Sequence, residues 1–107
     1  MSDVSEQVVV TRNEDEHRWE ARVDGALAGF AEYRQTDELV IFTHTEVDAS
    51  FEGQGVGTAL ARHALDEVFD EGTHKVMPLC PFIKGWIRRH PEYVPLVHGA
   101  PPAPPPD

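Results

Sequence analysis

Three glycines at alternate positions are the feature that most constrains this chain. Gly53, Gly55 and Gly57 stand where the spacing of apolar residues changes. Before them apolar and polar residues alternate, which is typical of strands; after them apolar residues recur at steps of three and four, which is typical of a helix. Glycine has no Cβ, so its backbone N–H can approach a ligand closely. A loop of this kind, followed by a helix N-terminus, is predicted to hold a phosphate.

An antiparallel meander of about four strands is predicted before the loop. The β-branched run at 8–10 opens the first strand, and 19–23 alternates between apolar and polar residues. Asp24-Gly25 is a strong hairpin signal. Further strands are predicted at 27–33 and 39–47. The apolar start of the last one predicts a central strand that is covered on both faces.

Two helices, with a short strand between them, are predicted after the loop. The first begins at Val56 and ends at Gly72, a typical C-terminal glycine. Its buried face is predicted to comprise Leu60, Ala61, Ala64, Leu65, Val68 and Phe69. A strand follows at 75–79, where Pro78 leaves one side unpaired. Pro81 begins a second helix that has Cys80 near its N-cap and ends at Pro91. The predicted fold class is α+β, with a mostly antiparallel sheet and a short C-terminal helix.

A chain of 107 residues holds one small domain. We expect this domain to span 7–99, between a disordered N-terminus at 1–6 and a disordered proline-rich tail at 100–107. The tail contains five of the nine prolines and favours polyproline II, which either binds an aromatic groove on a partner or is a solvated end.

The net charge of −10 makes nucleic acid an improbable partner and favours a basic small molecule or a basic protein tail. We expect no membrane span and no secretory signal. The single cysteine excludes a disulfide scaffold and favours a reduced, cytoplasmic setting. The histidines show no ligand spacing, so no metal site is predicted. The oligomeric state cannot be inferred.

Two common nucleotide motifs do not match the loop. A P-loop requires a lysine that is absent here, and a dinucleotide fingerprint has its glycines at the first, third and sixth positions. The loop resembles that of the GNAT superfamily of N-acetyltransferases, whose signature is Gln/Arg, two residues, Gly, one residue, then Gly/Ala. Gly55 and Gly57 occupy its two small positions, while Glu52 stands at the Gln/Arg position.

The stretch from Pro78 to Phe82, followed by the stretch from Arg88 to Tyr93, resembles a small single-domain GNAT subfamily. This resemblance covers roughly 8–97. It implies a fold in which the strands on either side of the glycine-loop helix splay apart, with the pantetheine of acetyl-CoA between them. Pro78 suits such a splay.

The resemblance implies acetyl-CoA as the cofactor, bound through its pyrophosphate at the loop. The expected binding residues are Val47, Gly53, Gln54, Gly55, Val56, Gly57 and Thr58. Lys84, Arg88 and Arg89 form a basic island in an acidic chain. This island either meets the adenosine phosphates of CoA or is a solvated helix face.

His44 and Cys80 are the leading candidates for catalysis, and Tyr93 is a third. His44, placed on the strand face shared with Phe42 and Glu46, is either a base for the acceptor amine or a histidine bonded within the sheet. Cys80, at a helix N-terminus, is either a thiolate relay or a small buried hydrophobe. Tyr93 is either the acid for the leaving thiolate or a core aromatic. A right-handed crossover would bring His44 and Cys80 to one edge of the sheet.

The leading hypothesis is acetyl-CoA-dependent N-acetyl transfer to an unidentified amine, which attacks the thioester directly. The acceptor would be a small-molecule amine or a basic protein. The alternatives are a non-catalytic acyl-CoA-binding module that acts through a protein partner, and a small interaction protein whose loop binds nothing.

Overall fold

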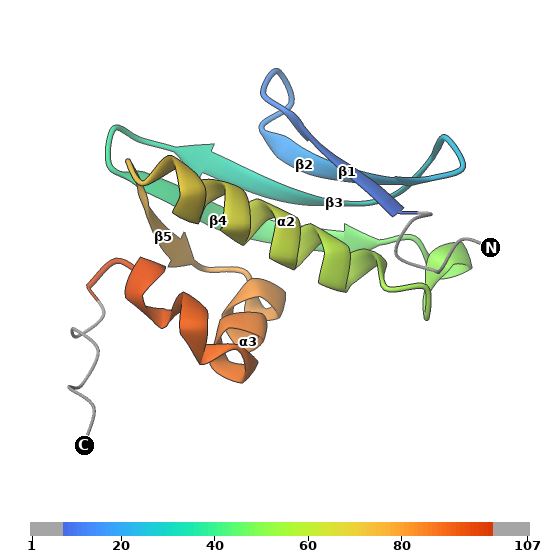
Figure 1. Ribbon diagram of the computed structural model, residues 1–107. Helices are drawn as coiled ribbons and strands as arrows, with labels where there is room; N and C mark the ends of the chain where they lie inside the picture. The colour runs from blue at the N-terminus through green and yellow to red at the C-terminus, as the bar shows by residue number, and fades with distance from the viewer. Residues whose placement is uncertain (1–7, 100–107) are drawn as a thin grey trace.

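The computed structural model describes residues 8–99, so the predictions for 1–6 and for the proline-rich tail lie outside the described residues. Five strands and two helices are connected in the order shown in Figure 1. Their bounds are β1 Val8–Asn13, β2 Arg18–Val23, β3 Ala26–Gln35, β4 Leu39–Val47, α2 Val56–Glu71, β5 Lys75–Pro78 and α3 Pro81–Arg89. Two 3₁₀ segments, η1 Ala49–Phe51 and η2 Pro91–Leu96, follow β4 and α3.

The strands form one sheet in the order β1-β2-β3-β4-β5. The first four pair antiparallel, which confirms the meander, and β5 pairs parallel with β4. Asp24 and Gly25 both have positive φ, 50° and 84°, as the tight hairpin between β2 and β3 requires. The mostly antiparallel α+β fold is therefore the one that the sequence predicts.

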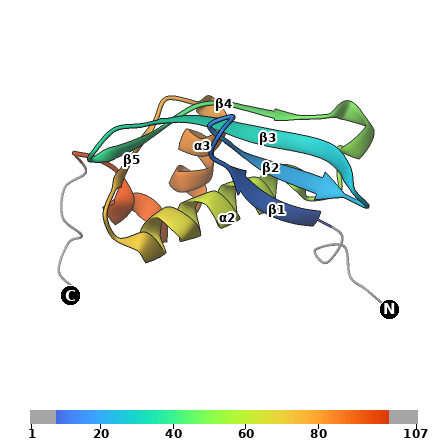
Figure 2. The ribbon, with the colours of Figure 1, turned by 90° about the horizontal axis from the view of Figure 1, so that it is seen from above.

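Both helices lie on the same face of the sheet (Figure 2). We call this the helix face and the opposite one the open face. Trp19, Phe42 and Leu60 are fully buried between the sheet and α2. The prediction that β4 is covered on both faces is wrong: Leu39 and Ile41 are only half-buried, because no described helix covers the open face.

The predicted helix boundaries are confirmed at both ends of α2. Gly72 is its C-cap in the left-handed conformation, with φ 70°. Phe69, however, is 55% exposed, so its predicted place in the buried face is wrong. It lies at the margin of the apolar stripe and borders a shallow hollow beside Leu96 rather than the sheet. In the described part of the chain, no helix is both long and apolar enough to cross a membrane.

Candidate active site

The strand ladder between β4 and β5 ends halfway along β4. β5 pairs only with Leu39–Phe42. The Phe42 carbonyl accepts the last two hydrogen bonds, from the backbone N–H of Leu79 at 3.0 Å and of Cys80 at 2.9 Å. β4 continues to Val47 without β5 beside it. The two strands thus separate after Pro78, which leaves a gap along the second half of β4.

Backbone groups of β4 point into this gap. The Asp48 N–H donates to the Ala28 carbonyl at 2.8 Å, in line with the β3–β4 ladder. Because ladder bonds alternate along an antiparallel strand, the N–H and C=O groups of Thr45 and Val47 point away from β3. An extended polar chain placed in the gap would find hydrogen-bond partners there.

A β-bulge in β4 coincides with the start of the gap. Glu32 of β3 faces His44, whereas the next residue, Tyr33, faces Phe42, so Thr43 has no opposite residue. The Thr43 hydroxyl donates to the Glu32 carbonyl at 3.4 Å. An extra residue shifts the alternation of side chains between the two faces of a strand.

The bulge corrects the predicted position of His44. Phe42 lies on the helix face, where it stacks near Trp19, but His44 lies on the open face. The prediction that these two residues share a face is therefore wrong. His44 does share a face with Glu46, since its Nε2 is 3.9 Å from Glu46 Oε1. Its ring centroid is 6.1 Å from that of Phe30.

Cys80 lies on the other side of the gap. It is the N-cap of α3, as predicted, and is 3% exposed. Its Sγ donates to the hydroxyl of Thr45 at 3.3 Å. Thr45 pairs with the buried Ala31, which places it on the helix face. His44 and Cys80 therefore border the gap from opposite faces of the sheet.

The glycine loop lies between η1, which follows β4, and the start of α2. Gly53 and Gly55 have positive φ, 83° and 78°, and a Cβ at either would meet open space. The first hydrogen bond of α2 runs from the Ala59 N–H to the Gly55 carbonyl at 2.9 Å, and Gly55 has no side chain to cap the helix. The preceding N–H groups of the first turn are therefore without helical partners, as an anion site requires.

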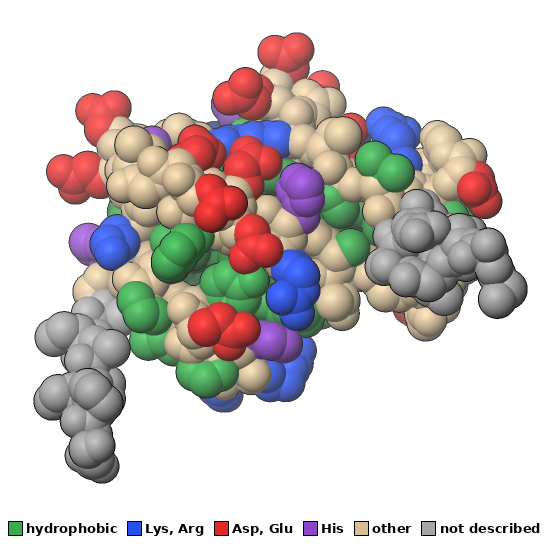
Figure 3. Space-filling model, viewed as in Figure 1, with side chains coloured by type: hydrophobic (Ala, Val, Ile, Leu, Met, Phe, Trp, Pro, Cys, Tyr) green, Lys and Arg blue, Asp and Glu red, His purple; other side chains and the backbone are tan. Residues whose placement is uncertain are grey.

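The negative side chains of α2 itself lie away from its N-terminal end. The first turn of α2 contains no acidic residue. The acidic side chains gather over the C-terminal half of α2 (Figure 3), namely Asp66, Glu67, Asp70 and Glu71. The first turn thus fits the pyrophosphate of acetyl-CoA in both donors and charge, whereas Glu52 brings one negative charge to the start of the loop.

The third glycine has a different role from the first two. Gly57 lies in the first turn of α2, and a Cβ there would come within 2.8 Å of the Phe82 ring. Gly57 therefore lets the beginning of α3 pack closely against the beginning of α2. Lys84 and Arg88 are exposed on α3, and no ion pair within residues 8–99 involves either of them.

Tyr93 is directed toward α2 and is 5% exposed. Its hydroxyl donates to Asp66 at 2.6 Å. Burial, together with the hydrogen bond and negative charge of Asp66, raises the pKa of Tyr93 to about 12. These contacts favour the predicted packing role over the role of an acid.

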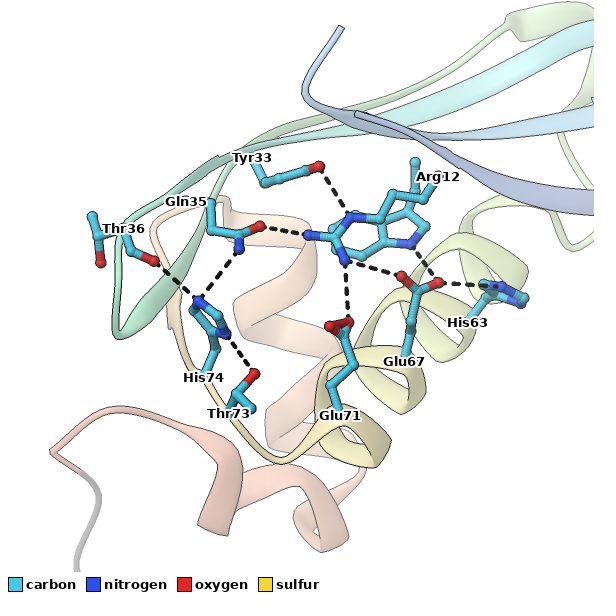
Figure 4. A network of polar contacts seen from close by, with 10 residues as sticks. Arg12, Tyr33, Gln35, Thr36, His63, Glu67, Glu71, Thr73 and His74 are labelled. Carbon is cyan, nitrogen blue, oxygen red and sulfur yellow. Dashed lines mark hydrogen bonds and ion pairs between the residues drawn. The ribbon is translucent and has the colours of Figure 1, made fainter. Parts of the chain in front are cut away.

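Sequence reasoning missed one cluster, which we call the Arg12 network. The Arg12 guanidinium lies 4.6 Å from the ring centroid of Trp19 and 4.9 Å from that of Tyr33. It donates to the Tyr33 hydroxyl at 3.0 Å, to Glu67 at 3.0 Å and to Glu71 at 3.1 Å (Figure 4). Arg12 thereby connects the edge strand β1 to α2.

The network continues on both sides of Arg12. Its guanidinium also donates to Gln35, whose amide contacts His74 (Figure 4). Burial lowers the pKa of Arg12, but hydrogen bonds and charge from Tyr33 and Glu67 outweigh it and raise that pKa above its ordinary value. The only signal in the sequence was an arginine in an apolar edge strand. Its partners are distant in the sequence and could not be predicted from it.

Comparison with solved structures supports this description of the fold. The NMR solution structure of a GCN5-like protein from Staphylococcus aureus is 20% identical, with a TM-score of 0.64, over 90% of this chain and 93% of that one. A ribosomal-protein-alanine N-acetyltransferase from Brucella melitensis is 22% identical, with a TM-score of 0.54, over 84% of this chain and 67% of that one. No curated protein matches the chain.

A family model described as GCN5-related N-acetyl-transferase matches residues 18–96. This match includes the gap beside β4, the glycine loop and both helices. The chain belongs to the GCN5-related N-acetyltransferase family.

Proposed function

We propose that this protein transfers the acetyl group of acetyl-CoA to an amine that attacks the thioester directly. The single observation that carries the proposal is the gap after Phe42, which opens beside the unpartnered N–H groups at the start of α2. Bound acetyl-CoA supplies an activated acetyl thioester. The pyrophosphate would be held by Gly53–Thr58, and the pantetheine by the backbone of Thr45 and Val47.

His44 is proposed as the base. The acceptor amine forms a C–N bond to the acetyl carbon and the C–S bond to CoA breaks. His44 removes a proton from the amine nitrogen, and the CoA thiolate leaves. His44 is half exposed, so an acceptor can reach its ring from the open face. The adjacent carboxylate of Glu46 would stabilise the imidazolium that forms.

Cys80 is proposed to line the thioester end of the gap without a covalent role. Its thiol is buried and donates to Thr45, so a relay would require that contact to break and the sulfur to become accessible. A thiol that only lines the gap can keep its contact with Thr45 and stay buried. This observation favours direct attack over an acetyl-cysteine intermediate.

Turnover by single variants tests these roles. We expect His44→Ala to lower kcat by about 10²–10⁴-fold, the usual contribution of a general base, with partial recovery at high pH as free amine accumulates. Cys80→Ser should retain most of the turnover. His98→Ala, at an exposed histidine outside the gap, is the matched control.

Three outcomes would contradict the proposal. Acetyl-Cys80 trapped at a kinetically competent rate would replace direct attack with a relay. Full activity of the His44→Ala variant would remove His44 from the mechanism. CoA binding without turnover on any amine would favour a non-catalytic acyl-CoA-binding module.

A further inference from the structure

A hollow of about 400 Å³ lies at the ends of β3 and β4, outside the glycine loop and next to the gap, with which it shares Val47. Its walls include Leu27, Phe30, Glu46 and Asp48. This volume lies within the range of about 300–1,000 Å³ found for small-molecule sites. The hollow is therefore a candidate site distinct from the glycine loop.

The hollow opens on the same side as His44. Phe30 and Glu46 face each other across β3 and β4 in the register, and both lie on the open face with His44. The Phe30 ring centroid is 6.1 Å from that of His44, and the Glu46 carboxylate is 3.9 Å from His44 Nε2. A molecule in the hollow would thus lie beside the proposed base.

The hollow has apolar residues and acidic residues in its walls, and these suit two different parts of one ligand. Phe30 and Leu27 offer apolar surface, and Leu27 is 37% exposed. The carboxylate of Asp48 is held in place because it accepts a hydrogen bond from the Ser50 N–H at 2.8 Å. An apolar stem would pack on the first pair of residues while a cation meets Glu46 and Asp48.

The neighbouring cation does not neutralise these carboxylates. Arg18 stacks over Phe30 at 4.8 Å, and its guanidinium donates to Glu20 at 2.8 Å. Within residues 8–99, Glu46 forms an ion pair only with His44, and that pair exists only when the ring is protonated. A ligand with a positive charge of its own would supply the missing partner of Glu46.

We propose that the hollow binds the acceptor and selects a small amine with a second cationic group on a short methylene chain, that is, a diamine or polyamine. This inference rests on the proposed function. The attacking nitrogen must be neutral when it reacts, so it cannot be the group that the carboxylates hold. The second nitrogen remains an ammonium beside Glu46 and Asp48, and the chain between the two lies against Phe30.

Matched amines and a charge-matched pair of variants test this selection. We expect kcat/KM for 1,4-diaminobutane and spermidine to exceed that for n-butylamine at least tenfold. Glu46→Gln should reduce this preference below threefold, because KM rises for the diamine and not for butylamine. Loss of the carboxylate beside His44 should lower kcat for both amines alike and so leave their ratio unaffected. Asp70→Asn removes the same charge at an exposed site on α2 and should leave the preference intact.

A binding measurement separates this inference from the proposed function. In ¹⁵N NMR spectra, 1,4-diaminobutane should shift the amides of Leu27, Phe30 and Glu46 and leave that of Gly55 unchanged. Such shifts without transfer to any amine would retain the binding site and refute the catalytic function. Equal kcat/KM for diamine and monoamine, equal losses of both in Glu46→Gln, or a preference for a lysine peptide over every diamine would overturn the proposed selection.

Discussion

The two ends of α2 differ in how their polar groups are satisfied. At the C-terminal end, Arg12 donates to Glu67 and Glu71, and further contacts reach Gln35 and His74. At the N-terminal end, Gly55 provides no cap and the first N–H groups have no helical partner. One end is completed by side chains of other elements, whereas the other leaves N–H groups that can bind a ligand.

The charges on α2 follow the same division. Acidic residues at a helix C-terminus are unfavourable because the helix dipole is negative there. The last turns of α2 nevertheless contain Asp70 and Glu71 and no basic residue. Arg12 offsets part of that repulsion from a neighbouring strand. The comparison assigns the Arg12 network to stability and leaves the N-terminal end of the helix as the proposed binding end.

The largest expected effect comes from breaking the C-terminal end. Arg12→Met should lower the free energy of unfolding by about 2 kcal/mol, because a partly buried ion pair loses its cation and Glu67 keeps only Trp19 and His63 as polar partners within residues 8–99. Urea denaturation measures this loss. CoA affinity of the folded variant should remain within about twofold of the parent, since mutations at distant sites act independently.

Arg34→Met is the matched control for this variant. Arg34 is an exposed arginine on β3, so its replacement should change the free energy of unfolding by less than about 0.5 kcal/mol. Equal losses in the Arg12 and Arg34 variants would contradict the structural role of the network.

A pair of glycine variants sharpens the comparison within α2 itself. Gly55 and Gly72 both have left-handed backbones, and a Cβ at either would meet open space. Gly55→Ala and Gly72→Ala should therefore lower the free energy of unfolding by a similar amount, about 1 kcal/mol. In the parent, CoA at 100 times its Kd should add about 2.7 kcal/mol. We expect only Gly55→Ala to reduce this stabilisation, as measured by thermal shift with and without CoA.

Gly72→Ala is the control for backbone strain in that experiment. If CoA stabilises both variants as much as it stabilises the parent, the loop does not hold the pyrophosphate. Loss of the CoA effect in both would mean that strain in α2, and not the loop, determines binding.

Local signals made the fold predictable from the sequence. Asp24-Gly25, Gly72 and Pro81 each require a particular backbone conformation, and each was correctly placed in its turn or cap. The pattern of apolar residues identified the five strands and both α-helices of residues 8–99 to within a few positions, but not the 3₁₀ segments η1 and η2. Such signals depend only on neighbouring residues.

The site was less predictable because it depends on register. A single unopposed residue, Thr43, moves His44 to the face opposite Phe42. No residue type marks such a bulge, since it arises from how β3 and β4 align over their whole length. For the same reason, the contacts between Arg12 and α2 and between Cys80 and Thr45 join elements that the sequence leaves far apart.

The smallest expected effect concerns the charge beside the binding end. Arg88 is exposed on α3, whose beginning packs on the first turn of α2, and it has no ion-pair partner within residues 8–99. If it meets the adenosine 3′-phosphate of CoA, Arg88→Gln should raise the Kd for CoA by about threefold, as expected for a screened surface contact. The Kd for dephospho-CoA should not change, because that ligand lacks the phosphate. Isothermal titration at low and high salt measures both ligands, and the difference should shrink as salt rises. Arg34→Gln removes the same charge near the other end of the sheet and controls for net charge. Identical losses for the two ligands, or identical behaviour of the two variants, would show that Arg88 does not contact that phosphate.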